Sequence, residues 1–203
     1  MRTPASFFHE RRALAALVLS GSLAVGACSR PAASSGTSLV PDARATIAAD
    51  SGELHLTNIR QITNGGENAE AYWSTDGQWI TFQSTRDGRT CDQQYTMRAD
   101  GTQLTKVSVG GKTTCGWFLP GAKRLFFGST HAADSACPTK PDPSKGYVWG
   151  IDPFDSYAVG RDGKDLKRLT NCGVYTAEGV LSPDGKRIVF TSLKDGDLDI
   201  YTM

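Results

Sequence analysis

The sequence lacks the residue patterns of the common catalytic and metal centres. Only three of its 203 residues are histidine, and zinc centres are built mainly from histidine and cysteine. There is no Gly-x-Ser-x-Gly turn of a serine hydrolase, no His-Glu-x-x-His metalloprotease motif, and no glycine-rich phosphate loop that opens a helix. We therefore expect a protein that is not an enzyme and that holds no metal or cofactor.

The sequence also lacks an excess of charge of either sign. It has 22 Lys and Arg against 21 Asp and Glu, a formal net charge of +1. Without residues 1–27, which include three arginines and one glutamate, this charge becomes −1. Proteins that bind nucleic acid usually carry a strongly basic surface. We therefore expect no nucleic-acid partner.

The N-terminus has the features of an export signal. Three arginines precede an apolar run at 13–25, which is too short and too rich in small residues to span a membrane. The run ends in Val25–Cys28, which resembles the lipobox of bacterial lipoproteins, where the cysteine carries diacylglycerol. We predict a signal peptide at 1–27 and lipidation of Cys28. An ordinary secretory signal with an incidental Cys28 is the alternative.

The lipoprotein resemblance implies that the chain is anchored in a membrane of the cell envelope. Ser29 after the cysteine implies sorting to the outer membrane, facing the periplasm. Residues 28–52 are rich in Ala, Ser, Pro and Gly, a composition typical of a disordered tether.

Four further cysteines follow the tether, and none of them forms a Cys-x-x-Cys pair: Cys91, Cys115, Cys137 and Cys172. An even number in an exported chain indicates disulfides rather than metal ligands. Four cysteines allow three pairings, which the sequence by itself leaves open.

The rest of the chain repeats itself. Trp73–Ser84 and Leu181–Ser192 share the pattern Ser-x-Asp-Gly-x-x-Ile-x-Phe-x-Ser, and Phe118–Ser129 is a weaker copy. A second element, Tyr95–Leu104, recurs at Tyr157–Leu166, and Ile200–Met203 begins it a third time. Internal repeats of this length indicate a repeated structural unit.

Each repeat encodes antiparallel strands joined by tight turns. Ser-Pro-Asp-Gly at 182–185 favours a tight turn, because proline restricts φ and glycine accepts positive φ. The continuous apolar run that follows, 188–190, is typical of a strand covered on both faces. No helical periodicity appears after the signal peptide. We predict an all-β fold with about four strands in each repeat.

These repeats resemble the β-propeller repeat of TolB and of the modules that precede the hydrolase domain in prolyl-oligopeptidase-type enzymes. The resemblance implies a WD40-like propeller over 53–203, with four-stranded blades at about 68–107, 113–170 and 176–203 and a closing outer strand at 54–63. Closed propellers have about four to eight blades. We therefore expect a piece of a longer propeller, whose open blades favour self-association; two chains that complete one six-bladed ring are the alternative.

The propeller resemblance also implies a cysteine pairing and a binding surface. Loops of neighbouring blades share one face, which implies the bridges Cys91–Cys115 and Cys137–Cys172. Glu70 and Glu178 occupy matching positions, expected just before the inner strands at the mouth of the central funnel.

The long insertion at 131–156 contains several prolines with Tyr147 and Trp149, and it is a candidate contact surface for peptide or glycan. Solvated charge at the funnel rim, and a loop that packs on its own blade, are the alternatives for these two surfaces. Asp195–Asp199 resembles the start of a calcium loop but fits a hairpin turn of the repeat better.

The function expected from these features is that of a lipid-anchored, non-enzymatic module that binds an envelope protein or peptide. The alternative is the substrate-gating propeller of an exported peptidase similar to prolyl oligopeptidase, whose catalytic domain lies outside this sequence. A purely structural surface scaffold is a third hypothesis.

Overall fold

A computed structural model describes residues 46–48, 50–146 and 150–203. Apart from one 3-10 turn at Pro143–Lys145, the regular structure of these residues is β. No helix among them has the length and apolar character needed to cross a membrane.

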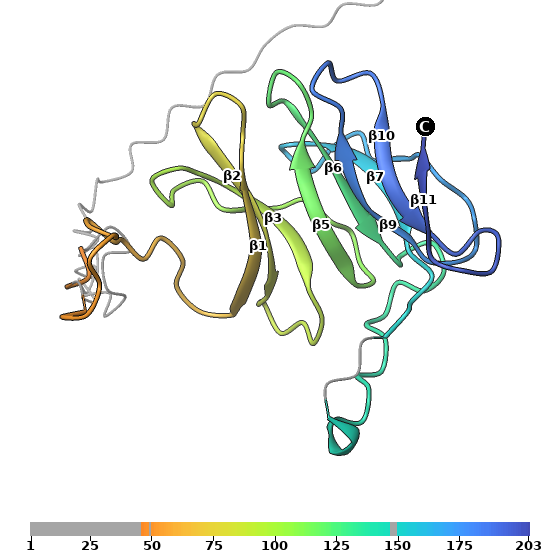
Figure 1. Cartoon of the computed structure of the whole chain (residues 1–203), viewed down its shortest axis with the longest axis horizontal. Coiled ribbons are helices and arrows are strands. Elements are labelled where there is room, and N and C mark those ends of the chain that lie inside the picture. The colour runs from red at the N-terminus through yellow and green to blue at the C-terminus, as the bar shows by residue number, and fades with distance from the viewer. Residues whose placement is uncertain (1–45, 49, 147–149) are drawn as a thin grey trace, which may run out of the picture. The chain divides into compact units, whose positions relative to one another are not determined.

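The strands form three antiparallel sheets that follow one another along the chain (Figure 1). We call them blades 1, 2 and 3. Blade 1 contains β1 (Glu67–Trp73), β2 (Trp79–Thr85), β3 (Gln93–Arg98) and β4 (Thr105–Lys106). Blade 2 contains β5 (Thr113–Phe118), β6 (Arg124–Ser129), β7 (Asp155–Gly160) and β8 (Lys167–Arg168). Blade 3 contains β9 (Thr176–Leu181), β10 (Ile188–Ser192) and β11 (Asp199–Thr202). The all-β fold of antiparallel blades in an unclosed arrangement is thus confirmed.

The repeated turn builds the first hairpin of blades 1 and 3. Ser74 Oγ donates to Asp76 Oδ1 at 2.6 Å, and the same oxygen accepts from the backbone N of Gln78 at 3.0 Å. Blade 3 repeats this arrangement, with Ser182 Oγ at 2.5 Å from Asp184 Oδ1. These local bonds fix the hairpin and therefore the register of the strands on either side.

Blade 2 is covered on both faces, as its continuous apolar run indicates. Leu125 and Phe127 of β6 are fully buried in a cluster that includes Val107, which follows blade 1. Phe126 points to the opposite face, where Gly179 of β9 approaches so closely that an added Cβ would lie 2.4 Å from the Phe126 ring. Because successive side chains of β6 point to opposite faces of the sheet, this one strand contacts residues on the sides of both blade 1 and blade 3.

The contact between blades 1 and 2 is hydrogen-bonded as well as apolar. Gln83 of β2 donates from Nε2 to the carbonyl of Thr113 at 3.1 Å, and its Oε1 accepts from the backbone N of Cys115 at 3.1 Å. These partners belong to β5, so a buried glutamine of one blade fixes the backbone of the next. Buried amides are stable only when their donors and acceptors are paired in this way.

The segment 54–63 does not form the expected closing strand. Leu54 is 83% exposed, and the segment's backbone makes only an isolated bridge, between Arg60 and Thr46, among the described residues. Ile62 instead packs on the buried face of blade 1 formed by Ile80, Phe82, Tyr95 and Met97. Among the described residues, the segment therefore contacts blade 1 through Ile62 and is not paired with β11.

Candidate binding site on the first strands of the blades

The first strand of every blade contains a β-bulge at the same repeat position. The pairing register shifts between Ala69 and Tyr72 in β1, between Thr114 and Gly116 in β5, and between Ala177 and Val180 in β9. The bulged residues are Glu70, Cys115 and Glu178, and all three have positive φ, at 50°, 32° and 58°. Positive φ is uncommon outside glycine, and a bulge redirects a side chain out of the strand's regular alternation.

The bulges of blades 1 and 2 bring two side chains into contact. The Sγ atom of Cys115 lies 3.9 Å from Oε2 of Glu70. The hydroxyl of Tyr72 donates a short hydrogen bond to the same carboxylate oxygen. The ring of Tyr72 lies over that of Trp117, with ring centroids 3.8 Å apart. A carboxylate, a thiol and two aromatic rings therefore meet where β1 faces β5.

Blade 3 contributes a second carboxylate. Burial raises the pKa of the Cys115 thiol, and the charges of both Glu70 and Glu178 raise it further, while a hydrogen bond from Thr114 acts in the opposite direction. Burial also raises the pKa of Tyr175, followed by the charge of Glu178 and a hydrogen bond to it. Cys115 therefore lies within the field of carboxylates from both neighbouring blades. The bulge cluster consists of Glu70, Tyr72, Cys115, Trp117, Tyr175 and Glu178.

The chemistry of the bulge cluster suits binding better than nucleophilic catalysis. A reactive cysteine needs a lowered pKa, whereas the pKa of Cys115 is raised. Glu70 and Glu178 are exposed, and the buried Nε1 of Trp117 has no hydrogen-bond partner in the described part of the chain. Carboxylates beside aromatic rings attract a cation. No group of three His, Cys, Asp or Glu side chains in residues 46–48, 50–146 and 150–203 is arranged to hold a metal ion.

The structure refines the placement of the glutamates found from the repeats. Glu70 and Glu178 lie inside β1 and β9 rather than before them. Cys115 was missed as their equivalent, although it stands three residues before Phe118, as Glu70 stands before Trp73. Alignment of the repeats could have identified Cys115, but this position holds a cysteine where the other two repeats have a glutamate. Cys28, Tyr147 and Trp149 lie outside the described residues.

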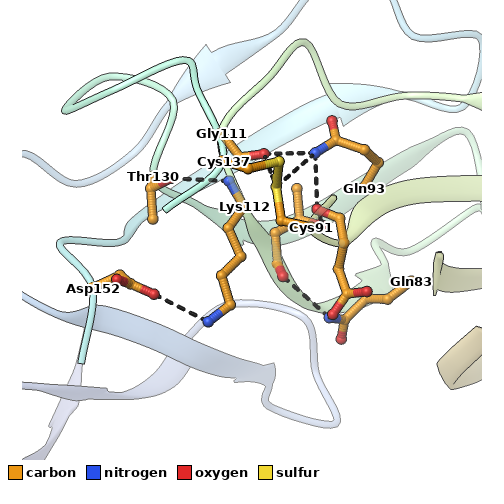
Figure 2. Close-up of polar contacts among 10 residues, drawn as sticks. Gln83, Cys91, Gln93, Gly111, Lys112, Thr130, Cys137 and Asp152 are labelled. Atoms are coloured by element: carbon orange, nitrogen blue, oxygen red, sulfur yellow. Dashed lines mark hydrogen bonds and ion pairs between the residues drawn. A yellow bond between two sulfur atoms is a disulfide. The ribbon is translucent and has the colours of Figure 1, made fainter. Parts of the chain in front are cut away.

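Among the described residues there is one disulfide, between Cys91 and Cys137, with Cα atoms 5.5 Å apart (Figure 2). Cys115 and Cys172 are free thiols. The predicted bridges Cys91–Cys115 and Cys137–Cys172 are therefore wrong. Cys115 lies within β5 at its bulge instead of in a loop. The insertion after β6 brings Cys137 back to the loop between β2 and β3, where Cys91 lies.

Asp195 takes part in the turn chemistry of the repeat. The hydroxyl of Tyr201 donates to Asp195 Oδ2 at 2.8 Å. Tyr95 makes the same contact with Asp87 in blade 1, also at 2.8 Å. The second hairpin of each of these blades is thus closed by an aspartate and a tyrosine from the following strand.

No family model and no curated protein matches the chain. Among solved structures, a TolB protein of Agrobacterium tumefaciens is similar, with a TM-score of 0.51 and 22% identity over 71% of this chain and 48% of that one. TolB of Acinetobacter baumannii has a TM-score of 0.49 and 24% identity over 68% of this chain and 31% of its own. An oligogalacturonate lyase of Vibrio parahaemolyticus has a TM-score of 0.47 and 17% identity, over 72% of this chain and 39% of the lyase.

The chain spans about half the length of the first of these structures. At this level of identity the likeness concerns the fold and not the activity. The three antiparallel sheets, together with this likeness, show that the chain folds as part of a β-propeller of the kind seen in TolB.

Proposed function

We propose that this chain is a non-enzymatic binding module that accepts a basic side chain of a protein or peptide at the bulge cluster. The observation that carries the proposal is the contact of Glu70 Oε2 with Cys115 Sγ at 3.9 Å, together with a second carboxylate, Glu178 of blade 3, whose charge also raises the pKa of that thiol. Each carboxylate is held on a bulge whose backbone is fixed by strand pairing. The site is therefore largely formed before a ligand arrives, which reduces the entropic cost of binding.

A lysine or arginine side chain fits this arrangement in two ways. Its charged group hydrogen-bonds to carboxylate, an interaction that contributes about 1.5–3 kcal/mol when one partner is charged. Its aliphatic stem and cationic head also suit the paired rings of Tyr72 and Trp117, since a cation over an aromatic face contributes about 0.5–1 kcal/mol at exposed sites. One such anchor gives weak binding, so we expect flanking residues of the partner to add affinity.

The peptide-binding proposal is tested by calorimetric titration with two capped pentapeptides that differ only at the central residue, lysine or norleucine. We expect the lysine peptide to bind more tightly, and the Glu70→Gln/Glu178→Gln double variant to lose about tenfold or more, because a tenfold change corresponds to about 1.4 kcal/mol. Asp197→Asn is the matched control, since it removes an exposed charge of blade 3 outside the cluster. Equal binding of the two peptides would refute the proposal.

The proposal also places the module in the cell envelope, attached by lipid on Cys28. The support is the lipobox-like Val25–Cys28 after a short apolar run. Mass spectrometry of the protein from a bacterial membrane fraction should find residue 28 as the N-terminus, with diacylglycerol attached. The Cys28→Ser variant should appear in the soluble fraction, and membrane retention of that variant would contradict lipid anchoring.

A further inference from the structure

A cavity of about 160 Å³ lies where blade 1 meets the insertion between β6 and β7. One wall comes from blade 1, including Glu67 of β1 and Asp92 in the loop before β3. The other comes from the insertion, at Pro138 and Lys140, and Lys112 borders the cavity just before β5. The bulge cluster shares no residue with this cavity, so binding in the cavity does not depend on the function proposed for the cluster.

The Cys91–Cys137 disulfide holds the two walls together. Pro138 and Lys140 lie within three residues of Cys137, so this bond fixes their wall against the loop of Cys91. At the other end of the insertion, Lys112 Nζ forms an ion pair with Asp152 at 3.0 Å. Figure 2 shows both connections, together with the carbonyl of Gly111, which accepts from Gln93 Nε2 at 2.6 Å. The cavity therefore keeps its shape without a ligand.

Charges of both signs surround Asp92. Burial raises the pKa of its carboxyl group, the charges of Lys112 and Lys140 lower it, and the charge of Glu67 raises it. The hydrogen bond that Asp92 accepts from Gln83 Nε2 is long, at 3.4 Å. The ammonium of Lys112 is already paired with Asp152. A half-buried carboxylate with one weak donor thus lies near the exposed ammonium of Lys140.

A ligand that carries both charges would complement this lining. An ammonium group would supply strong donors to Asp92 and Glu67, and a carboxylate would pair with Lys140, since charge-assisted hydrogen bonds are the stronger ones. A neutral sugar would meet the same groups without compensating either charge. The volume is close to that of a cavity of about 150 Å³ that holds one benzene ring. A cavity of this volume has room for a single small amino acid.

We propose that this cavity binds a free α-amino acid with a small side chain, as its zwitterion, and that binding requires the Cys91–Cys137 disulfide. The bond places the wall that carries Lys140 opposite Asp92. Reduction leaves the insertion attached to the blade contact through the ion pair of Lys112 with Asp152, and the wall at 138–141 is then free to move away from blade 1. The site would thus bind its ligand only in an oxidising compartment, where the disulfide persists.

The test is calorimetric titration of the oxidised protein with glycine, alanine, serine and threonine. The matched probes are n-propylamine, propionate and glucose. At least one amino acid should bind, and the amine and the carboxylate alone should bind about tenfold or more weakly, because each satisfies only one sign of charge. No binding by any amino acid, or equal binding by glucose, would overturn the proposal.

Two single variants and one control locate the site. Asp92→Asn and Lys140→Gln should each weaken amino-acid binding about tenfold, whereas Lys123→Gln, exposed in the hairpin after β5, should leave it unchanged. Unchanged binding in both pocket variants would overturn the assignment of the site. None of these changes removes a cysteine, so the disulfide stays intact and the variants remain informative if cysteine variants fail to fold.

The redox requirement is tested on the same protein with and without a thiol reductant, and on the Cys91→Ser/Cys137→Ser variant. We expect loss of amino-acid binding after reduction, while circular dichroism still reports the β-sheet. Undiminished binding by the reduced protein would overturn the requirement for the disulfide. If reduction unfolds the whole protein, the β-sheet signal is lost together with binding. The location of the site is then tested with the Asp92→Asn variant, in which the disulfide is intact.

Discussion

Phe82, Phe127 and Phe190 occupy the same position in the three repeats, yet the structure gives them different surroundings. Phe82 and Phe127 are 1% and 0% exposed, whereas Phe190 is only partly buried. The repeat pattern assigns all three to the second strand of a blade. It cannot tell how much of each ring is covered, because that depends on which neighbouring elements are present.

We therefore expect unequal costs for truncating these phenylalanines. Phe127→Ala should lower the free energy of unfolding by about 3–5 kcal/mol, the range for a fully buried phenylalanine. Phe190→Ala should cost clearly less, because part of its ring already contacts water. Urea denaturation followed by tryptophan fluorescence measures both values. Equal losses would show that blade 3 is covered more completely than described.

The phenol of Tyr95 gives a prediction about alkaline pH. Burial, together with a hydrogen bond to Asp87, raises the pKa of Tyr95 from 10.0 to about 12. The folded state therefore holds this proton more tightly than the unfolded state does. Its contribution to stability is complete below pH 10 and is lost as the pH rises towards 12. Unfolding by urea at pH 9 and pH 11 should show a smaller fall for Tyr95→Phe than for the parent protein.

At the scale of elements, the strands were predictable and several of their contacts were not. The tight turns and the apolar runs were sufficient to predict antiparallel strands, because each is a local sequence pattern that has a strand beside it. The insertion is different, since Cys137 reaches Cys91 across 46 residues of sequence. Neither a turn signal nor periodicity reports a contact of that kind. The bulges at Glu70 and Cys115 likewise arise from strand pairing.

The approach of β9 to β6 is an element-scale feature that one substitution tests. An added Cβ at Gly179 would lie 2.4 Å from the ring of Phe126, which is itself fully buried. Gly179→Ala should therefore destabilise the protein by about 1–3 kcal/mol through overpacking. Gly52→Ala is the control, because its new Cβ would meet its nearest neighbour at an ordinary 3.4 Å. Thermal unfolding should separate the two variants, and equal midpoints would contradict the described packing.

At the scale of the whole molecule, the outer faces of blades 1 and 3 differ in how they are covered. On blade 1, Ile62 packs on the face formed by Ile80, Phe82, Tyr95 and Met97, which is buried. On blade 3, Val189 and Ile200 are 40% and 71% exposed. In blade 1 the equivalent positions are Thr81 and Gln94, which face blade 2 and bond to each other at 2.6 Å. At these positions blade 3 therefore exposes apolar side chains, whereas blade 1 has polar side chains that face blade 2.

Exposed apolar blade faces favour association, so we expect the purified protein to self-associate through blade 3. Val189→Thr/Ile200→Gln copies the residues of blade 1 onto this face and should shift the protein towards monomer. Leu54→Gln, which removes an 83% exposed leucine away from the blades, should have little effect. Sedimentation velocity across a concentration series measures the change. An association that persists in the double variant would place the contact elsewhere.

The proposed binding function depends most on the meeting of three blades at Cys115, and the titration of this thiol tests that meeting directly. The rate of alkylation of Cys115 by iodoacetamide, followed against pH in a Cys172→Ser background, reports its pKa. Burial and the two carboxylates predict a value above the ordinary 9.0 for a cysteine thiol, and Glu70→Gln/Glu178→Gln should bring it down. An ordinary pKa that neither glutamate influences would mean that the blades do not assemble the bulge cluster, and the binding function proposed for it would fall with that result.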